Sequence, residues 1–109
     1  MRINKINAVA VRQTDVEATV SDQFLARWSP RAMSGQALTV EQVSCLIEAA
    51  RWAPSCFNAQ PWRFAWAIAG TPHWQPLFDS LIEANQRWVK NAGALIAVAS
   101  RIEFEHNDQ

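Results

Sequence analysis

The first half of the chain carries hydrophobic positions at helical spacing in two segments. In the first segment, residues 16–28, apolar side chains recur three and four positions apart, which predicts an amphipathic helix. Pro30 ends this helix, because proline lacks an amide proton and disfavours helical angles at the residue before it. The residues of the apolar stripe are Val16, Val20, Phe24, Leu25 and Trp28. Residues 1–15 lack such a pattern, and we expect them to form an N-terminal arm.

The second helix is predicted from Thr39 to the residues before Pro54. Thr39 and Gln42 have the spacing of a capping box, in which each side chain satisfies the other's free backbone amide. One face then collects the apolar side chains Val43, Leu46, Ile47 and Ala50. The segment Ala53–Trp62, bounded by two prolines, is expected to be a loop.

The second half alternates between strand and helix patterns. Residues 63–69 alternate large apolar with smaller or charged residues and predict a strand, and residues 94–99 are an uninterrupted apolar run that predicts a strand covered on both faces. Between them, residues 74–88 predict one helix. The resulting order is an α+β or α/β pattern, and its two strands make an incomplete sheet because three or more are normally needed.

Composition limits the function. The 109 residues suit one domain, and ten Lys and Arg balance ten Asp and Glu, which argues against binding nucleic acid through phosphate neutralisation. No apolar run is long enough for a membrane span, and the N-terminus has no signal-peptide pattern, so we expect a cytoplasmic protein. Cys45 and Cys56 are expected to be free thiols, and no His and Cys spacing indicates a metal site.

Three segments could carry chemistry. Arg27, Ser29 and Arg31 flank a helix end and could bind a phosphate, or they could be solvated side chains. The 53–62 loop offers amides and hydroxyls between aromatic residues, which suits the rim of a heteroaromatic ring. It could equally be a proline-rich corner that satisfies its own backbone. Asn85 lies late in a helix and would need a backbone or ligand partner if it faced inward.

Taken in order, these segments resemble the nitroreductase-like flavoprotein family. Residues 27–31, Arg-Trp-Ser-Pro-Arg, match the family's R-x-S-x-R signature. Residues 50–62 match its A-x-x-A-P-S-x-x-N-x-Q-P-W block, the most specific feature, and Asn85-Gln86-Arg87-Trp88 fits the region that follows. The resemblance covers roughly residues 16–105 and leaves residues 106–109 as a polar tail. It implies a three-layer α+β fold, here reduced to helices and two strands.

The resemblance also implies an FMN-dependent oxidoreductase that works as a homodimer. NAD(P)H would reduce the flavin, and a nitroaromatic, a quinone or a similar electrophile would then be reduced in turn. By this resemblance Arg27 and Ser29 hold the phosphate of FMN, Arg31 reaches its ribityl or pyrimidine side, and Asn85 bonds the pyrimidine edge. The residues expected to approach the flavin from the partner subunit are Pro54, Ser55 and Asn58.

Three departures from the family pattern are visible. Cys56 stands where a hydroxyl residue is common, and Trp88 stands where some members carry a lysine directed at the flavin. Family members are also nearly twice as long, so we expect this chain to be an N-terminal fragment with weak or absent flavin binding and no turnover. The alternative is a non-catalytic domain that acts only in self-association or in binding a partner, with its tryptophans and unfinished sheet as contact surface.

Overall fold

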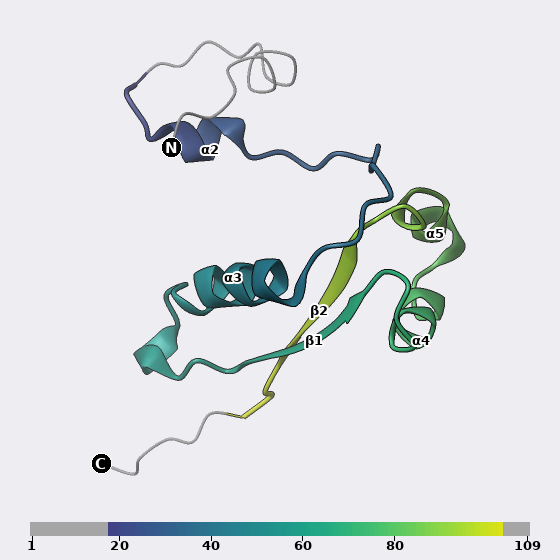
Figure 1. Cartoon of the computed structure of the whole chain (residues 1–109). Helices are drawn as coiled ribbons and strands as arrows, with labels where there is room; N and C mark the ends of the chain where they lie inside the picture. Colours follow the sequence, from purple (N-terminus) through teal and green to yellow (C-terminus); the bar gives the residue numbers. More distant parts are fainter. Residues whose placement is uncertain (1–17, 104–109) are drawn as a thin grey trace. The chain divides into compact units, whose positions relative to one another are not determined.

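The computed structural model describes residues 18–103, and the chain divides into two compact units, Met1–Pro30 and Arg31–Gln109 (Figure 1). The predicted arm over residues 1–15 and the predicted tail over residues 106–109 lie outside the described residues. In chain order the described elements are α2 (Asp22–Ala26), α3 (Val40–Arg51), a 3-10 turn (Cys56–Asn58), β1 (Trp62–Ile68), α4 (Trp74–Asp79), α5 (Glu83–Val89) and β2 (Ala94–Ser100).

In the first unit, helix α2 is much shorter than the predicted helix over residues 16–28. It begins after Ser21 and ends before Arg27, and both of these flanking residues have extended backbone angles. Phe24 is 65% exposed. Because most of a helix's stability in proteins comes from burying one face, this exposed stripe does little to extend α2. The prediction was therefore right about a helix before Pro30 and wrong about its length, while Val16 lies outside the described residues.

Helix α3 begins the second unit's regular structure and confirms the predicted capping box. The Gln42 amide donates to Thr39 Oγ1 over 3.2 Å, and the Thr39 amide donates to Gln42 Oε1 over 2.9 Å. These two bonds satisfy amides that the first turn of a helix otherwise leaves unpaired. Val43 is 1% exposed and Ile47 is half-buried, so the predicted apolar face is buried at these two positions, whereas Leu46 is 51% exposed.

Strands β1 and β2 form an antiparallel pair in which Trp62 lies opposite Ser100 and Ile68 lies opposite Ala94. Paired residues share a face of the sheet, so one face carries Phe64, Trp66 and their partners, and the other carries mostly alanines. The last four residues of β2 are exposed, which contradicts the predicted cover on both faces within the described part of the chain. Two strands have too few neighbours to bury a whole apolar strand.

The single helix predicted over residues 74–88 is two helices, α4 and α5. The break comes at Ile82, whose backbone is extended (φ −65°, ψ 151°), and Ser80 Oγ donates to the Leu77 carbonyl at the end of α4. The side chain of Gln86, which lies on α5, spans this break: its Nε2 donates to the carbonyl oxygens of Phe78 (3.3 Å) and Leu81 (3.0 Å). Hydrophobic spacing could not reveal this break, because Leu81 and Ile82 continue the apolar pattern through it.

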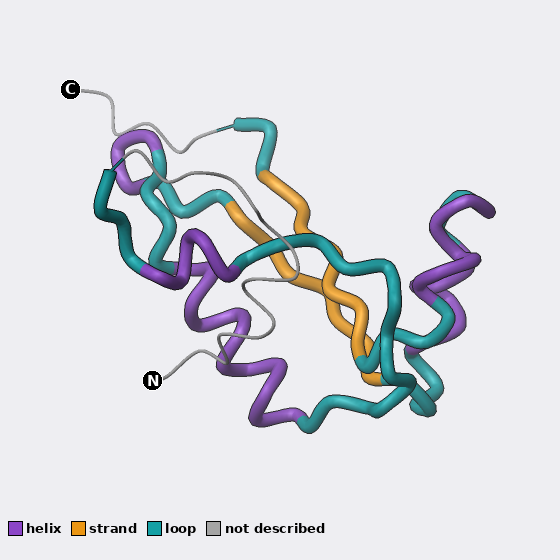
Figure 2. Tube along the Cα trace, turned by 90° about the horizontal axis from the view of Figure 1, so that it is seen from above, coloured by secondary structure: helices purple, strands orange, loops and turns teal. Residues whose placement is uncertain are grey.

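Backbone hydrogen bonds tie the segment before α3 to the turn before β2. The Gly35 amide donates to the Asn91 carbonyl (2.9 Å), and the Leu38 amide donates to the Gly93 carbonyl (3.2 Å). The same Gly93 carbonyl accepts from Ala69 at the end of β1 (3.1 Å). Residues 35–38, the end of β1 and the start of β2 therefore meet at one end of the sheet, which we call the α5 end (Figures 1 and 2).

Candidate functional site

The arginine-rich motif spans the boundary between the two units. Arg27 lies directly after α2 with an extended backbone, and Ser29 follows in the same unit; both side chains are exposed. Arg31 is the first residue of the second unit and is also exposed. Exposed guanidinium groups can bind a phosphate through planar, charge-assisted hydrogen bonds.

Arg31 and Asn85 belong to segments that meet at the α5 end of the sheet. Arg31 precedes by four residues the Gly35 amide that bonds to Asn91, and Asn91 follows α5, on which Asn85 lies. The Asn85 side chain is exposed. It therefore does not face inward, and its amide is accessible to a ligand at the surface.

The segment Ala53–Pro61, which we call the corner, connects the end of α3 to the start of β1. Ser55 Oγ accepts a hydrogen bond from the Gln60 amide over 3.0 Å, and the Ser55 carbonyl accepts from the Asn58 amide over 3.0 Å. The corner thus satisfies part of its own backbone, as one of the two interpretations of this loop expected. The Ser55 hydroxyl keeps a hydrogen that it can donate to a ligand. Pro54 and Asn58 are exposed.

Three corner residues other than glycine have left-handed backbone angles. They are Phe57 (φ 51°), Asn58 (φ 52°) and Gln60 (φ 47°). Asparagine tolerates this region, but a bulky aromatic residue rarely occupies it, and each such residue costs on the order of 1 kcal/mol or more. Strain of this kind accumulates at binding and catalytic sites, which favours a functional role for the corner beyond simple chain reversal.

The two groups of predicted site residues lie at opposite ends of the sheet. Helix α5, which carries Asn85, lies at the α5 end, where Ile68 pairs with Ala94, and the segment that follows Arg31 reaches the same end through Gly35. The corner precedes Trp62 at the other end of β1 (Figures 1 and 2). The seven residues of β1 span about 20 Å at a rise of about 3.3 Å per residue. Within one chain the structure therefore places Asn85 at the other end of the sheet from Ser55 and Asn58.

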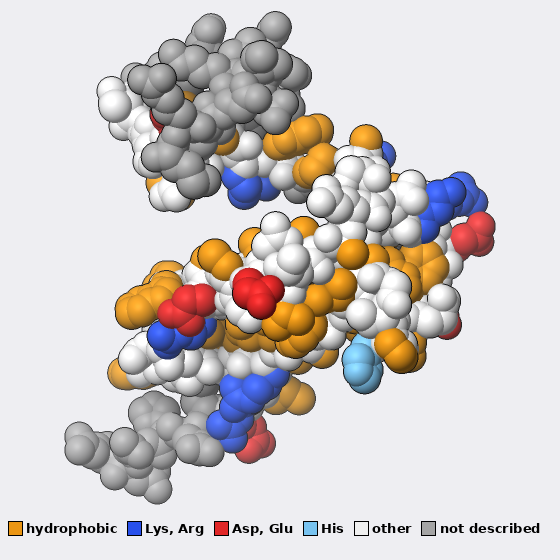
Figure 3. Space-filling model, in the orientation of Figure 1, with side chains coloured by type: hydrophobic (Ala, Val, Ile, Leu, Met, Phe, Trp, Pro, Cys, Tyr) orange, Lys and Arg blue, Asp and Glu red, His pale blue; other side chains and the backbone are white. Residues whose placement is uncertain are grey.

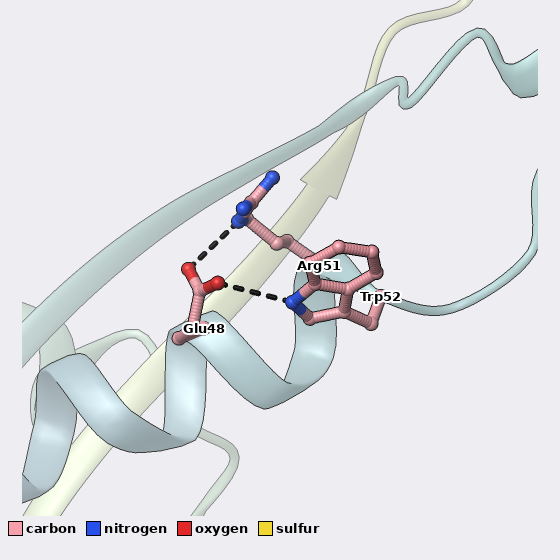
Figure 4. Close-up of polar contacts among 3 residues, drawn as sticks. All are labelled: Glu48, Arg51 and Trp52. Atoms are coloured by element: carbon pink, nitrogen blue, oxygen red, sulfur yellow. Dashed lines mark hydrogen bonds and ion pairs between the residues drawn. The ribbon is translucent and has the colours of Figure 1, made fainter.

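A polar cluster that the sequence motifs did not predict lies where α3 meets the corner. Glu48 accepts hydrogen bonds from Arg51 Nε (2.7 Å) and from Trp52 Nε1 (3.0 Å), and the Arg51 guanidinium carbon lies 5.0 Å from the centre of the Trp52 ring (Figure 4). Hydrogen bonds from Arg51 and then Trp52 hold the pKa of Glu48 below its ordinary value, and Glu48 raises the pKa of Arg51. The spacing of three and four residues from Glu48 is the signal that could have revealed the cluster.

Hydrophobic side chains reach the surface around this end of α3 and the corner (Figure 3). Trp52 is 74% exposed and Phe57 is 87% exposed. The thiol of Cys56 lies in the same corner, and both cysteines of the chain are free and exposed. Folded proteins usually bury most of the surface of Trp and Phe side chains, so the high exposure of both residues in this region is unusual.

Other site types receive no support from residues 18–103. In this range no three His, Cys, Asp or Glu side chains gather where they could hold a metal ion. Among the helices described, none has the length and apolar character that crossing a membrane requires.

Residues 25–108 match the model of the nitroreductase family. This match includes the arginine motif, the corner, both strands and α5. The chain belongs to the nitroreductase family. The predicted family resemblance is thereby confirmed.

A solved crystal structure supports the nitroreductase-like fold. It is the structure of an oxidoreductase containing FMN, with 44% sequence identity and a TM-score of 0.75 over 80% of this chain. The aligned part is 44% of that protein, so this chain spans less than half the length of its structural relative. A search of functionally curated proteins gives no match. Helices together with two antiparallel strands agree with the predicted reduced α+β fold.

Proposed function

We propose that this nitroreductase-family chain is part of an FMN-dependent oxidoreductase that uses NAD(P)H to reduce nitroaromatics, quinones or similar electrophiles. The observation that carries the proposal is the 44% identity to an oxidoreductase containing FMN, over a region that includes most of the chain. When bound, FMN supplies the hydride and electron transfer, and the protein supplies binding, orientation and local electrostatics.

The donor groups of the chain fit FMN. Guanidinium groups suit its phosphate, and we assign this role to Arg27 together with the Ser29 hydroxyl. Arg31 is assigned to the ribityl or pyrimidine side, and the Asn85 amide is assigned to the pyrimidine edge, because an amide can donate and accept at once. The segment that follows Arg31 bonds through the Gly35 amide to the Asn91 carbonyl just after α5, which is consistent with one ligand touching Arg31 and Asn85.

The corner is assigned to the flavin of a second subunit. Ser55 and Asn58 are separated from Asn85 by about the length of β1, so one chain cannot easily place them all around one ring system. A homodimer resolves this separation, because the corner of one copy can meet the α5 end of the other. Each of the two sites would then use Arg31 and Asn85 from one subunit and Pro54, Ser55 and Asn58 from its partner.

The test replaces the aligned 44% of the FMN-containing relative with this chain and measures flavin content and NAD(P)H oxidation. We expect a yellow protein that oxidises NAD(P)H when a quinone or a nitroaromatic is present. The 109-residue chain alone should bind FMN weakly at most and show no turnover, since it spans less than half of the relative.

Riboflavin is the matched control ligand, because it lacks only the phosphate. Arg27→Ala in the chimera should raise the Kd of FMN by about 10- to 100-fold, since hydrogen bonds to charged groups contribute about 1.5–3 kcal/mol, and should leave the Kd of riboflavin nearly unchanged. A folded dimeric chimera that takes up no flavin would refute the proposal and favour the non-catalytic alternative. Equal loss of FMN and riboflavin would refute the assigned role of Arg27.

A further inference from the structure

The side chain of Gln86 joins α5 to the end of α4, which lies beside it (Figure 1). Its Nε2 donates to the carbonyl oxygens of Phe78 (3.3 Å) and Leu81 (3.0 Å), and the residue is half-buried. A side-chain amide has two N–H donors, so one glutamine can serve both carbonyls. The last carbonyls of a helix lack partners within that helix, so the end of α4 offers acceptors for this amide.

Helix α5 depends on this contact at its N-terminal end. The helix has seven residues, and the residue before it, Ile82, gives it no side-chain cap. Helices this short are unstable by themselves in water and persist through contacts with the rest of the fold. At the C-terminal end of α5 that contact is Val89, which is 4% exposed. Residues 83–85 are exposed, so Gln86 is the first residue of the helix that is not exposed.

Asn85 lies in the first turn of α5, directly before Gln86. The backbone amides of both residues donate to the Ile82 carbonyl, over 2.9 Å from Asn85 and 3.1 Å from Gln86. Both bonds stay between α5 and its cap residue, whereas the Gln86 side chain reaches across the extended backbone of Ile82 to α4. Without that side chain, the turn that carries Asn85 can rotate about Ile82. Hydrogen bonds weaken steeply with misalignment, so a small rotation is enough to weaken a contact of the Asn85 amide.

We propose that Gln86 is a positioning residue for the flavin: it holds the first turn of α5 against the end of α4 and so orients the Asn85 amide towards the pyrimidine edge. The proposal rests on the proposed function, in which Asn85 bonds that edge. Gln86 acts through Asn85 and not on the flavin, because two backbone carbonyls accept from its Nε2. A glutamate cannot replace it, since a carboxylate accepts hydrogen bonds and does not donate them.

Hydrogen exchange in the 109-residue chain tests the first step without flavin. Gln86→Met removes both donors and keeps a good helix former of similar length, and Gln86→Glu removes them and keeps the shape. Each variant should speed exchange of the Asn85 amide by about 5-fold or more, since one or two hydrogen bonds are lost. Gln75→Met is the matched control, because Gln75 Nε2 donates to Asp79 Oδ1 within α4 over 2.6 Å. It should leave the exchange of the Asn85 amide unchanged.

The chimera described above tests the second step. Asn85→Ala should raise the Kd of FMN by about 10-fold and Gln86→Met by about 5-fold, because a misaligned amide loses about one hydrogen bond. Riboflavin should lose affinity by the same factors, since it has the same pyrimidine edge. The double variant should cost no more than Asn85→Ala alone, because both changes remove the same contact. The midpoint potential of the bound flavin should move in the same direction in both single variants, since hydrogen bonds to the ring tune it.

General loosening of the fold gives a different pattern, which would overturn the proposal. It weakens phosphate binding as well, so Gln86→Met would cost FMN more affinity than riboflavin, and the losses would add in the double variant. Two other results also overturn it: unchanged exchange of the Asn85 amide in both Gln86 variants, or an FMN Kd that Asn85→Ala raises and Gln86→Met does not. These results refute the positioning role alone, whereas a chimera that takes up no flavin refutes the proposed function and this proposal together.

Discussion

Gly93→Ala should damage the α5 end of the sheet more than any comparable glycine substitution. A Cβ atom at this position would overlap the carbonyl oxygen of Gln36 and would lie 3.2 Å from the Leu38 side chain and from the Leu38 backbone nitrogen. The obstructing atoms include backbone, so rotation of a flexible side chain cannot relieve the contact. Either the added methyl group stays in a strained close contact with the Gln36 carbonyl, or residues 36–38 move away from residue 93.

Both responses cost a similar amount. Compression into a packed site typically costs about 1–3 kcal/mol. If residues 36–38 move away instead, the hydrogen bonds from Gly35 to Asn91 and from Leu38 to Gly93 are lost, at about 1 kcal/mol each. Part of the burial of Leu38 is lost as well. We therefore expect the free energy of unfolding to fall by about 2–3 kcal/mol.

Urea unfolding followed by circular dichroism measures this loss, and hydrogen exchange at the Gly35 and Leu38 amides reports whether the segment is released. Gly70→Ala is the control, because Gly70 has φ 81° and nothing within 4 Å of an added Cβ. It should cost about 1 kcal/mol through backbone strain and leave those two amides protected. An unchanged urea midpoint for Gly93→Ala would show that the packing argument is wrong.

Three further predictions concern α3. Val43→Ala should lower the free energy of unfolding by about 2–3 kcal/mol in urea titrations, since two buried methyl groups are lost and a cavity remains. Thr39→Ala should lower it by about 1 kcal/mol, because the Gln42 amide loses its cap; Thr39→Ser should retain most of the stability. The pKa of Glu48 lies below its ordinary 4.5, so its contact with Trp52 should persist at neutral pH and disappear as the pH falls through that lowered pKa. Near-ultraviolet circular dichroism should show this acid change in the wild type and lose it in Glu48→Ala.

The family and the main local elements could be predicted from the sequence because they depend on neighbouring residues. The capping box of Thr39 and Gln42 needs only a spacing of three, and the strand predicted over residues 63–69, observed at Trp62–Ile68, needs only alternation. The motifs at residues 27–31, 50–62 and 85–88, taken in order, predicted the family, and the match over residues 25–108 confirms it. Helix length was less accessible: α2 is shorter than its apolar pattern because a helix persists only where another surface buries its stripe.

Contacts between distant segments required the tertiary structure. Nothing in the local sequence indicates that Gly93 must accommodate the Gln36 carbonyl, or that the Gln86 side chain reaches back to two carbonyls and closes the break between α4 and α5. The separation of Asn85 from the corner is of the same kind, because it depends on strand pairing rather than on motif spacing. The resemblance to the family thus predicted which side chains could bind a flavin. Only the pairing of β1 with β2 determines that Asn85 and the corner lie at opposite ends of one sheet, because strand direction and register are properties of the folded pair.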